Sequence, residues 1–289
     1  MVLPVRSNAK ALKVRYGQLN RISDFQSRYV MPRNIDVWVP KGYNPHGEKQ
    51  YSVLYMHDGQ NLFIPKLATY GMTWKVDSTM SALLKKKLIN DCIVVGIWKT
   101  EKRYPEYMPD KPFRSLSAKT KTVWIQEFGG EPISDDYLKF IVNELKPHID
   151  STYKTYQDRE HTFIAGSSMG GLISLYALLE YPNVFGGAGC ISTHWPGSHK
   201  IRGPEIPAAI KDYLKSALPQ DQSVKIYFDY GTKTLDSLYE PFQMMIDSVM
   251  IGKGYTDRQW ITRKFEGAEH NERSWSKRFD LPVKFLLGK

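Results

Sequence analysis

The sequence predicts an α/β fold built on one mostly parallel sheet. From about residue 51 onward, short apolar runs typical of buried strands alternate with longer segments of helical periodicity, an order that favours parallel connections. Before this region, two strand-like runs follow each other with no helix between them, which predicts an antiparallel pair. The 289 residues contain no repeat, low-complexity tract or linker, so we expect a single domain over residues 1–289.

The antiparallel pair is predicted from alternation. Ile35, Val37 and Val39 alternate in the run NIDVWVP, and the run VRYGQLNRI precedes it. Strands of the parallel region are expected near residues 52–56, 92–98, 162–165, 187–192, 224–228 and 260–265. Helices are expected on both faces of the sheet, over residues 73–89, 134–149, 169–181, 205–218, 239–252 and 274–287.

One strand-to-helix junction has the composition of a catalytic turn. In FIAGSSMGGL, residues 163–172, Gly166 and Gly170 flank Ser168 in the spacing G-x-S-x-G. Such a nucleophile elbow holds a serine in a sharp turn with its hydroxyl exposed above the sheet, and the glycines leave room for the folded backbone. A glycine-rich helix start that binds an anion has a similar composition. The strand before the motif and the amphipathic helix after it favour Ser168 as a nucleophile.

A nucleophilic serine needs a histidine base, and three histidines follow Ser168 in the chain. His270 lies in a polar loop after the last predicted strand, where this chain order places the base. His194 and His199 come too early, just after the strand that begins near residue 187, and are expected to be surface or pocket-wall residues. The sequence therefore predicts His270 as the base.

The acid that orients the histidine should lie between the serine and the histidine. Asp229 stands near the end of the strand in SVKIYFDYG, and Asp236 lies in the turn after it. We favour Asp236, because a carboxylate in a loop can reach across to the loop of His270. Asp229 remains the alternative and is expected to cap the strand or pair locally.

Two backbone amides are expected to stabilise the oxyanion of a tetrahedral intermediate. Met169 directly follows the candidate nucleophile, and its amide is the first donor. The turn HDGQ after an early strand offers the amide of Gln60, with Gly59 as the second choice. His57 and Asp58 in the same turn are expected to fasten it by hydrogen bonds.

Four motifs together resemble one enzyme family. YMHDGQNLF, AGSSMGG, GTKTLDSLY and GAEHNERSW occur in family order over residues 51 to about 285. They resemble the putative-esterase family of α/β-hydrolases, which includes enterochelin-type siderophore esterases, feruloyl and acetyl-xylan esterases, esterase D and the mycolyltransferases. The resemblance implies the α/β-hydrolase fold and a serine carboxylic-ester hydrolase that works through an acyl-enzyme. It implies a triad and two oxyanion amides at Ser168, Asp236, His270, Gln60 and Met169.

The segment 99–133 has the least regular pattern and is expected to be a long functional loop at the edge of the sheet that carries the catalytic loops. One interpretation places Arg103, Glu106 and Tyr107 of this segment in the wall of the substrate pocket. The alternative is that Arg103 and Glu106 form an ion pair that fastens the loop. Trp195 is expected to face the site or to pack beside it. Aromatic residues here favour a carbohydrate-linked ester, feruloyl or acetyl.

Charge and cysteine content exclude several other classes. The net charge of +10 favours anionic partners and would suit a polyanionic siderophore, yet the basic run LLKKKL stands on a predicted helix and no nucleic-acid motif accompanies it. Cys92 and Cys190 sit in apolar strands without metal-ligand spacing, so neither a metal nor another cofactor is expected. The apolar runs are too short to cross a bilayer. The partner is expected to be a small-molecule or oligosaccharide ester, with the oligomeric state left open.

The sequence leaves alternatives open for both the location and the activity of the protein. Residues 1–10 lack the apolar stretch of a secretory signal, which favours a cytoplasmic chain as it stands, or a periplasmic or secreted one if a signal was removed. An acyltransferase would use the same acyl-enzyme, and a serine peptidase the same fold, although the chain has no room for the additional domain of large oligopeptidases. A non-catalytic binding protein is disfavoured because all three triad candidates are present.

Overall fold

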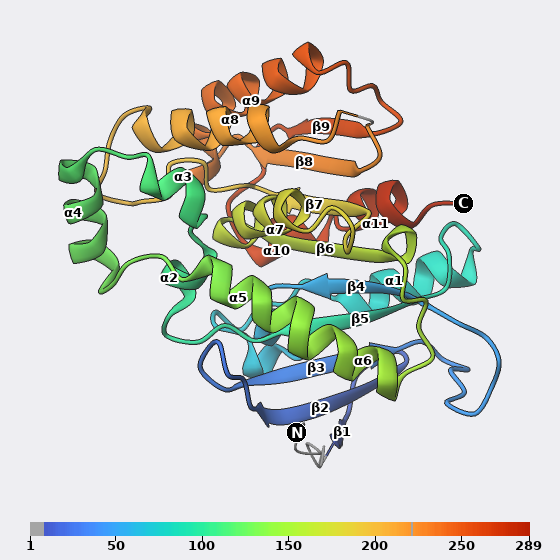
Figure 1. The fold of residues 1–289 in the computed structure, drawn as a ribbon. Coiled ribbons are helices and arrows are strands. Elements are labelled where there is room, and N and C mark those ends of the chain that lie inside the picture. Colours follow the sequence, from blue (N-terminus) through green and yellow to red (C-terminus); the bar gives the residue numbers. More distant parts are fainter. Residues whose placement is uncertain (1–8, 221) are drawn as a thin grey trace.

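A nine-stranded sheet runs through the part of the chain that this computed structural model describes, residues 9–220 and 222–289 (Figure 1). The expected absence of a signal concerns a segment that falls largely outside these residues. The strand order is β1-β2-β3-β5-β4-β6-β7-β8-β9, so that β1 and β9 form the two edges. The strands are β1 (Ala9–Leu12), β2 (Gln18–Phe25), β3 (Arg33–Val39), β4 (Ser52–Met56), β5 (Cys92–Ile97), β6 (Thr162–Ser167), β7 (Gly187–Ile191), β8 (Lys225–Gly231) and β9 (Trp260–Phe265).

The strand directions confirm the predicted sheet. The strands β5, β4, β6, β7, β8 and β9 are parallel, whereas β2 and β3 pair antiparallel and β3 joins β5 antiparallel. The strand β1 adds a further antiparallel edge that the sequence did not predict. Strands β4 and β5 are buried along their whole length and are nearly continuously apolar, as parallel strands covered on both faces should be.

Helices cover both faces of the sheet (Figure 1). Helices α5 to α9 pack on one apolar core, and α1, α10 and α11 pack on the other. The helices are α1 (Val76–Lys85), α2 (Arg103–Tyr107), α3 (Asp110–Arg114), α4 (Ala118–Phe128), α5 (Ser134–Phe140), α6 (Lys146–Thr152), α7 (Met169–Glu180), α8 (Glu205–Ala217), α9 (Glu240–Gly252), α10 (Glu272–Ser276) and α11 (Asp280–Leu287). A π-helical turn, Ile141–Leu145, joins α5 to α6, and the short 3₁₀ segments include η1 (Gly59–Asn61) and η5 (Thr234–Leu238).

Two predicted segments differ from the structure. The segment 99–133 contains α2, α3 and α4 instead of a long loop, and α2 and α3 are only five residues each, too short to show a helical period. The helix expected over 274–287 is broken into α10 and α11. Pro282 lies in the first turn of α11 and has no amide hydrogen to continue a helix from the preceding turn.

All the predicted catalytic loops emerge at one edge of the sheet. The turn around Gln60 follows β4, and Ser168 follows β6. Asp236 follows β8, and His270 follows β9. These are the carboxyl ends of parallel strands, where ligands bind in open α/β sheets. The topology therefore brings residues that are up to 210 positions apart in the chain to one edge.

Candidate active site

The candidate nucleophile sits in a strained turn. Ser168 has φ 60° and ψ −125° between β6 and α7, and its amide donates a hydrogen bond to the carbonyl of Ile191, 3.0 Å away. A Cβ on Gly166 would lie 2.8 Å from the carbonyl carbon of Gly170, so the turn closes only with glycine at this position. The backbone thus has the geometry that the G-x-S-x-G spacing predicted.

A buried carboxylate faces the candidate base. Oδ1 of Asp236 lies 2.5 Å from Nδ1 of His270, and its Oδ2 accepts hydrogen bonds from the amide of Gly231 and the hydroxyl of Ser192, both at 2.6 Å. Burial pushes the pKa of Asp236 upward, but the hydrogen bonds and charge of these partners, His270 first, hold it below its usual value. The group is therefore a carboxylate at neutral pH, able to orient the imidazole.

Ser192 connects this carboxylate to the C-terminal helices. Besides donating to Asp236, its Oγ accepts hydrogen bonds from the indole of Trp275 at 2.9 Å and from Arg278 at 2.8 Å. Its backbone φ of 43° turns the chain at the end of β7. Sequence reasoning did not single out Ser192; its place directly after a central parallel strand was the available signal.

The alternative acid, Asp229, is engaged elsewhere. Its carboxylate accepts hydrogen bonds from the Arg278 guanidinium at 2.9 and 3.2 Å and from the amide of Ser192 at 3.2 Å. Both Asp229 and Arg278 are almost completely buried. Among the described residues, Asp236 is the acid in contact with His270, whereas Asp229 forms the local pair that was its expected alternative role.

The turn that holds Gln60 is fastened on several sides. Asp58 accepts two hydrogen bonds from Arg103, both at 2.7 Å, and Nδ1 of His57 lies 2.9 Å from the hydroxyl of Tyr137. The expectation that His57 and Asp58 fasten the turn is thus confirmed. A Cβ on Gly59 would lie 2.6 Å from the backbone of the neighbouring strand β5, so this glycine allows the turn to pack against the sheet.

The same turn is tied to the histidine loop. The side-chain amide of Asn61 donates a hydrogen bond of 2.9 Å to Glu272, at the start of α10, two residues after His270. The amide of Lys99 donates to Oε1 of Gln60 at 3.2 Å. Asn61 and Glu272 are both buried, and neither was predicted from the sequence. These bonds fix the position of the backbone amide of Gln60 relative to the base.

A buried tyrosine and histidine stand behind the nucleophile. The hydroxyl of Tyr239 lies 2.8 Å from Nδ1 of His194 and is also within hydrogen-bonding reach of the Ser168 side chain. The amide of His194 donates to the carbonyl of Ser168 at 3.1 Å. Burial, assisted by the charge of His270, lowers the pKa of His194 to about 3, so this imidazole is neutral at physiological pH. It is a buried residue beside the candidate site rather than a surface histidine.

The three predicted substrate-contacting residues have other partners. Arg103 pairs with Asp58, not with Glu106, which instead forms a buried pair with Arg33 at 2.6 Å. The side chain of Tyr107 is completely buried, and its hydroxyl accepts a hydrogen bond of 3.4 Å from the amide of Asp58. Tyr107 therefore packs in the interior instead of forming a pocket wall, and Arg103 holds the Asp58 turn, while a contact of Arg103 with substrate stays a prediction.

Trp195 is likewise part of the core. Its side chain is 1% exposed, its indole donates a 3.0 Å hydrogen bond to Gln243, and its ring lies 5.6 Å from that of Phe228. Of the two expected roles, facing the site or packing, the structure shows packing.

A cavity of about 340 Å³ lies beside the Asp236 loop. Its apolar wall comes from the loop after β7 and from the η5 and α9 segments, and its polar side includes His194, His199 and Arg202. Nε2 of His194 has no hydrogen-bond partner among the described residues. The lining residues are His194, Pro196, Ser198, His199, Ile201, Arg202, Gly203, Leu235, Leu238 and Phe242.

Two features are absent from the described residues. No group of three or more histidine, cysteine or carboxylate side chains in residues 9–220 and 222–289 is arranged to hold a metal ion. Within the same part of the chain, no helix combines the length and the apolar character that crossing a membrane requires.

Comparison with known proteins places the chain in a family. It is 24% identical to the uncharacterized protein YbbA of Bacillus subtilis over 263 residues, 89% of this chain and 93% of YbbA. It is 26% identical to the ferri-bacillibactin esterase BesA of the same organism over 180 residues, 56% of this chain and 55% of BesA. A solved ferulic acid esterase superposes with a TM-score of 0.68 at 19% identity, covering 94% of this chain and 98% of that one. The family described as "Putative esterase" matches residues 28–281, and the chain therefore belongs to the putative-esterase family.

Proposed function

We propose that this member of the putative-esterase family is a serine carboxylic-ester hydrolase that works through an acyl-enzyme, with Ser168, His270 and Asp236 as its triad. The observation that carries the proposal is the 2.5 Å contact between Asp236 and His270 at the sheet edge where Ser168 occupies its strained turn. Family membership and the α/β-hydrolase fold support the same reaction.

The first half of the reaction transfers the acyl group to the enzyme. The Ser168 oxygen attacks the ester carbonyl carbon, and its proton passes to Nε2 of His270, the ring nitrogen that Asp236 leaves free. The amides of Met169 and Gln60 are proposed to hold the oxyanion of the tetrahedral intermediate. When the carbon–oxygen bond to the alcohol breaks, His270 returns its proton to that alcohol.

The second half uses water in place of the serine. Water attacks the acyl-enzyme carbonyl, gives its proton to His270, and the Ser168 oxygen leaves with that proton. Asp236 remains ionised throughout and stabilises the imidazolium each time it forms, which agrees with the lowered pKa of this carboxyl. An alcohol in place of water would give acyl transfer by the same steps.

A carbohydrate-linked ester, feruloyl or acetyl, is the proposed substrate. The 340 Å³ cavity beside the Asp236 loop supports an acyl group with an apolar body, because Leu235, Leu238 and Phe242 form much of its wall. A siderophore ester is the second candidate, which the net charge of +10 and the sequence similarity to BesA favour.

A substrate panel with active-site labelling tests the function. We expect turnover of p-nitrophenyl acetate and a clear preference among methyl ferulate, acetylated xylan and a ferric catecholate siderophore. A fluorophosphonate should add one phosphonyl group to the peptide that contains Ser168, and Ser168→Ala should abolish both labelling and turnover. Labelling of Ser167, or undiminished turnover by Ser168→Ala, would contradict the assignment.

A further inference from the structure

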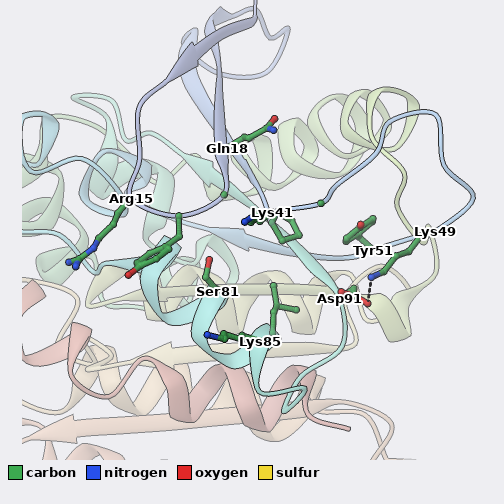
Figure 2. A pocket seen from close by; sticks show the side chains of 13 residues that line it. Arg15, Gln18, Lys41, Lys49, Tyr51, Ser81, Lys85 and Asp91 are labelled. Atoms are coloured by element: carbon green, nitrogen blue, oxygen red, sulfur yellow. Dashed lines mark ion pairs between the residues drawn. The ribbon is translucent and has the colours of Figure 1, made fainter.

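A second, larger cavity lies at the opposite edge of the sheet from the candidate active site (Figure 2). Its volume of about 710 Å³ is within the range of small-molecule sites. Tyr51 and Asp91 line it and directly precede β4 and β5, so they mark the amino ends of strands whose carboxyl ends carry the candidate site. Because a strand advances about 3.3 Å per residue, β4 alone separates the two sites by roughly 15 Å.

The cavity is strongly cationic. Arg15, Lys41, Lys49 and Lys85 line it together with a single carboxylate, Asp91, which leaves a net charge of +3. Lys49 is neutralised by Asp91, with the two charged groups 2.7 Å apart. No carboxylate among the described residues forms an ion pair with Arg15, Lys41 or Lys85. Three cations are therefore available to a ligand.

These cations come from separate segments and surround the cavity. Arg15 lies in the turn between β1 and β2, Lys41 after β3, and Lys85 in the last turn of α1. Figure 2 shows Lys41 and Lys85 in the middle of the view, Lys49 on one side and Arg15 on the other, with the Arg15 guanidinium directed away from the other three. Because the charges stand around the cavity instead of converging on one point, they suit a ligand with several separate negative charges better than a single small anion.

The turn that carries Arg15 is held in place by hydrogen bonds within the protein. Asp77, a buried carboxylate on α1, accepts hydrogen bonds from the amides of Arg15 and Tyr16 at 3.1 and 3.2 Å. The indole of Trp38 donates to the carbonyl of Tyr16 at 2.8 Å. Gly17 follows with φ 74° and has no room for a Cβ. Ligand binding at this wall would cost little conformational entropy, because the turn is already fixed.

The remaining lining suits a polyanion that also carries hydroxyl groups. Gln18 and Ser81 offer polar groups to ligand hydroxyls, and the Asp91 carboxylate, although paired with Lys49, can accept hydrogen bonds from hydroxyls as well. Tyr51 is only 3% exposed, whereas Tyr16 is 45% exposed and offers the face of its ring to a ligand in this cavity. We propose that this cavity binds an acidic oligosaccharide, a sugar chain that carries carboxylates among its hydroxyl groups. The proposal is independent of the esterase activity.

Calorimetric titration with tetragalacturonate tests the site. Wild-type protein should bind this acidic oligosaccharide and should not bind neutral xylotetraose. The double variant Lys41→Glu/Lys85→Glu should weaken tetragalacturonate binding at least tenfold, because two of the three available cations are reversed. Turnover of p-nitrophenyl acetate should stay unchanged, which also shows that the variant is folded and that any effect is separate from the esterase site.

A matched variant controls for overall charge. Lys119 and Lys215 are exposed, belong to α4 and α8, and do not line the cavity, so Lys119→Glu/Lys215→Glu makes the same charge change elsewhere. This variant should bind tetragalacturonate like the wild type. Equal weakening by both double variants, no measurable binding by the wild type, or tighter binding of oligothymidylate than of tetragalacturonate would each overturn the proposal.

Discussion

The Nδ1 atom of His270 lies 2.5 Å from Asp236, while Asp229, seven residues earlier, is bound to Arg278 instead. The two carboxylates are both buried but have different roles, and this difference predicts different phenotypes. Asp236→Asn should lower kcat by about 10⁴-fold, because the amide no longer holds the required tautomer of His270. Thermal unfolding of this variant should stay close to that of the wild type.

Asp229→Asn should instead destabilise the protein. It removes the nearer charged partner of the buried Arg278 guanidinium and leaves the Asp236 carboxylate 3.9 Å away, so the change should cost at most about 3–5 kcal/mol of unfolding free energy. Urea unfolding and steady-state kinetics on both variants check the pair of predictions. A larger kcat loss in Asp229→Asn, measured at a temperature where it is folded, would make Asp229 the acid.

Because the backbone of Ser168 is strained, replacing Ser168 with glycine should leave the protein more stable than replacing it with alanine. Ser168→Ala and Ser168→Gly both delete the hydroxyl and should both lose about 10⁴-fold or more in kcat. Residues other than glycine lose about 1–3 kcal/mol in such sparsely populated conformations, and Ser168 has φ 60° and ψ −125°.

Calorimetry should therefore find a higher Tm for Ser168→Gly than for Ser168→Ala. The comparison is matched, because both variants lose the same contact with Tyr239. A lower Tm for the glycine variant would mean that the turn is not strained for an L-residue.

Arg103 should affect kcat more than KM. It holds Asp58, in the turn that presents the Gln60 amide, by two hydrogen bonds of 2.7 Å. Arg103→Met should shift this turn and lower kcat, while Arg103→Lys should retain part of the activity. Arg114 forms a comparable but exposed pair with Asp110 in the same segment, so Arg114→Met serves as the control with unchanged kinetics. A rise in KM alone would restore the substrate-contact interpretation.

Two buried histidines should make the protein sensitive to acid. Burial is the largest cause that lowers the pKa of both His57 and His194, from the ordinary 6.5 to about 3. Between pH 6.5 and pH 3 the unfolded chain therefore binds protons that the folded protein does not, so stability falls as the pH falls through this window. Each histidine should contribute roughly 1.4 kcal/mol per pH unit.

Urea unfolding at pH 7 and pH 5 measures this effect. The difference in unfolding free energy between the two pH values should be smaller by roughly 2 kcal/mol in His194→Gln than in the wild type. Exposed His46 offers the control, because His46→Gln should leave the difference unchanged. An unchanged difference in His194→Gln would show that the buried imidazole is already charged.

The sequence could predict those parts of the candidate site that depend on a few consecutive residues or on the order of elements along the chain. The glycines around Ser168 are needed for one tight turn, and that turn can be read from five consecutive residues. His270 follows from chain order after the last strand. The sequence could not decide as easily between Asp236 and Asp229, because the difference between them depends on Arg278, which lies 49 positions after Asp229 in the chain.

Residues that act through distant partners were missed or misassigned. Ser192 connects β7 to Trp275 of α10 and to Arg278 between α10 and α11, and no local pattern marks such a position. Trp195 and Tyr107 belong to the expected segments but turn inward, since the direction of a side chain in an irregular segment or a five-residue helix depends on packing that sequence periodicity does not encode. In segment 99–133, α2 and α3 were hidden because each has only five residues, one of them a proline, whereas α4 has eleven residues and no proline and was also missed.

The outer strand β9 has a consequence for the behaviour of the protein at high concentration. An edge strand presents unpaired amides and carbonyls on which another chain can add a strand and begin to aggregate. Arg263 and Lys264 are exposed on β9, and Lys264 is held near Glu240 and Glu266 at 2.9 and 3.0 Å. Two copies that approached each other along β9 would bring these charged groups together and would have to desolvate them. The charges on this strand therefore oppose edge-to-edge association.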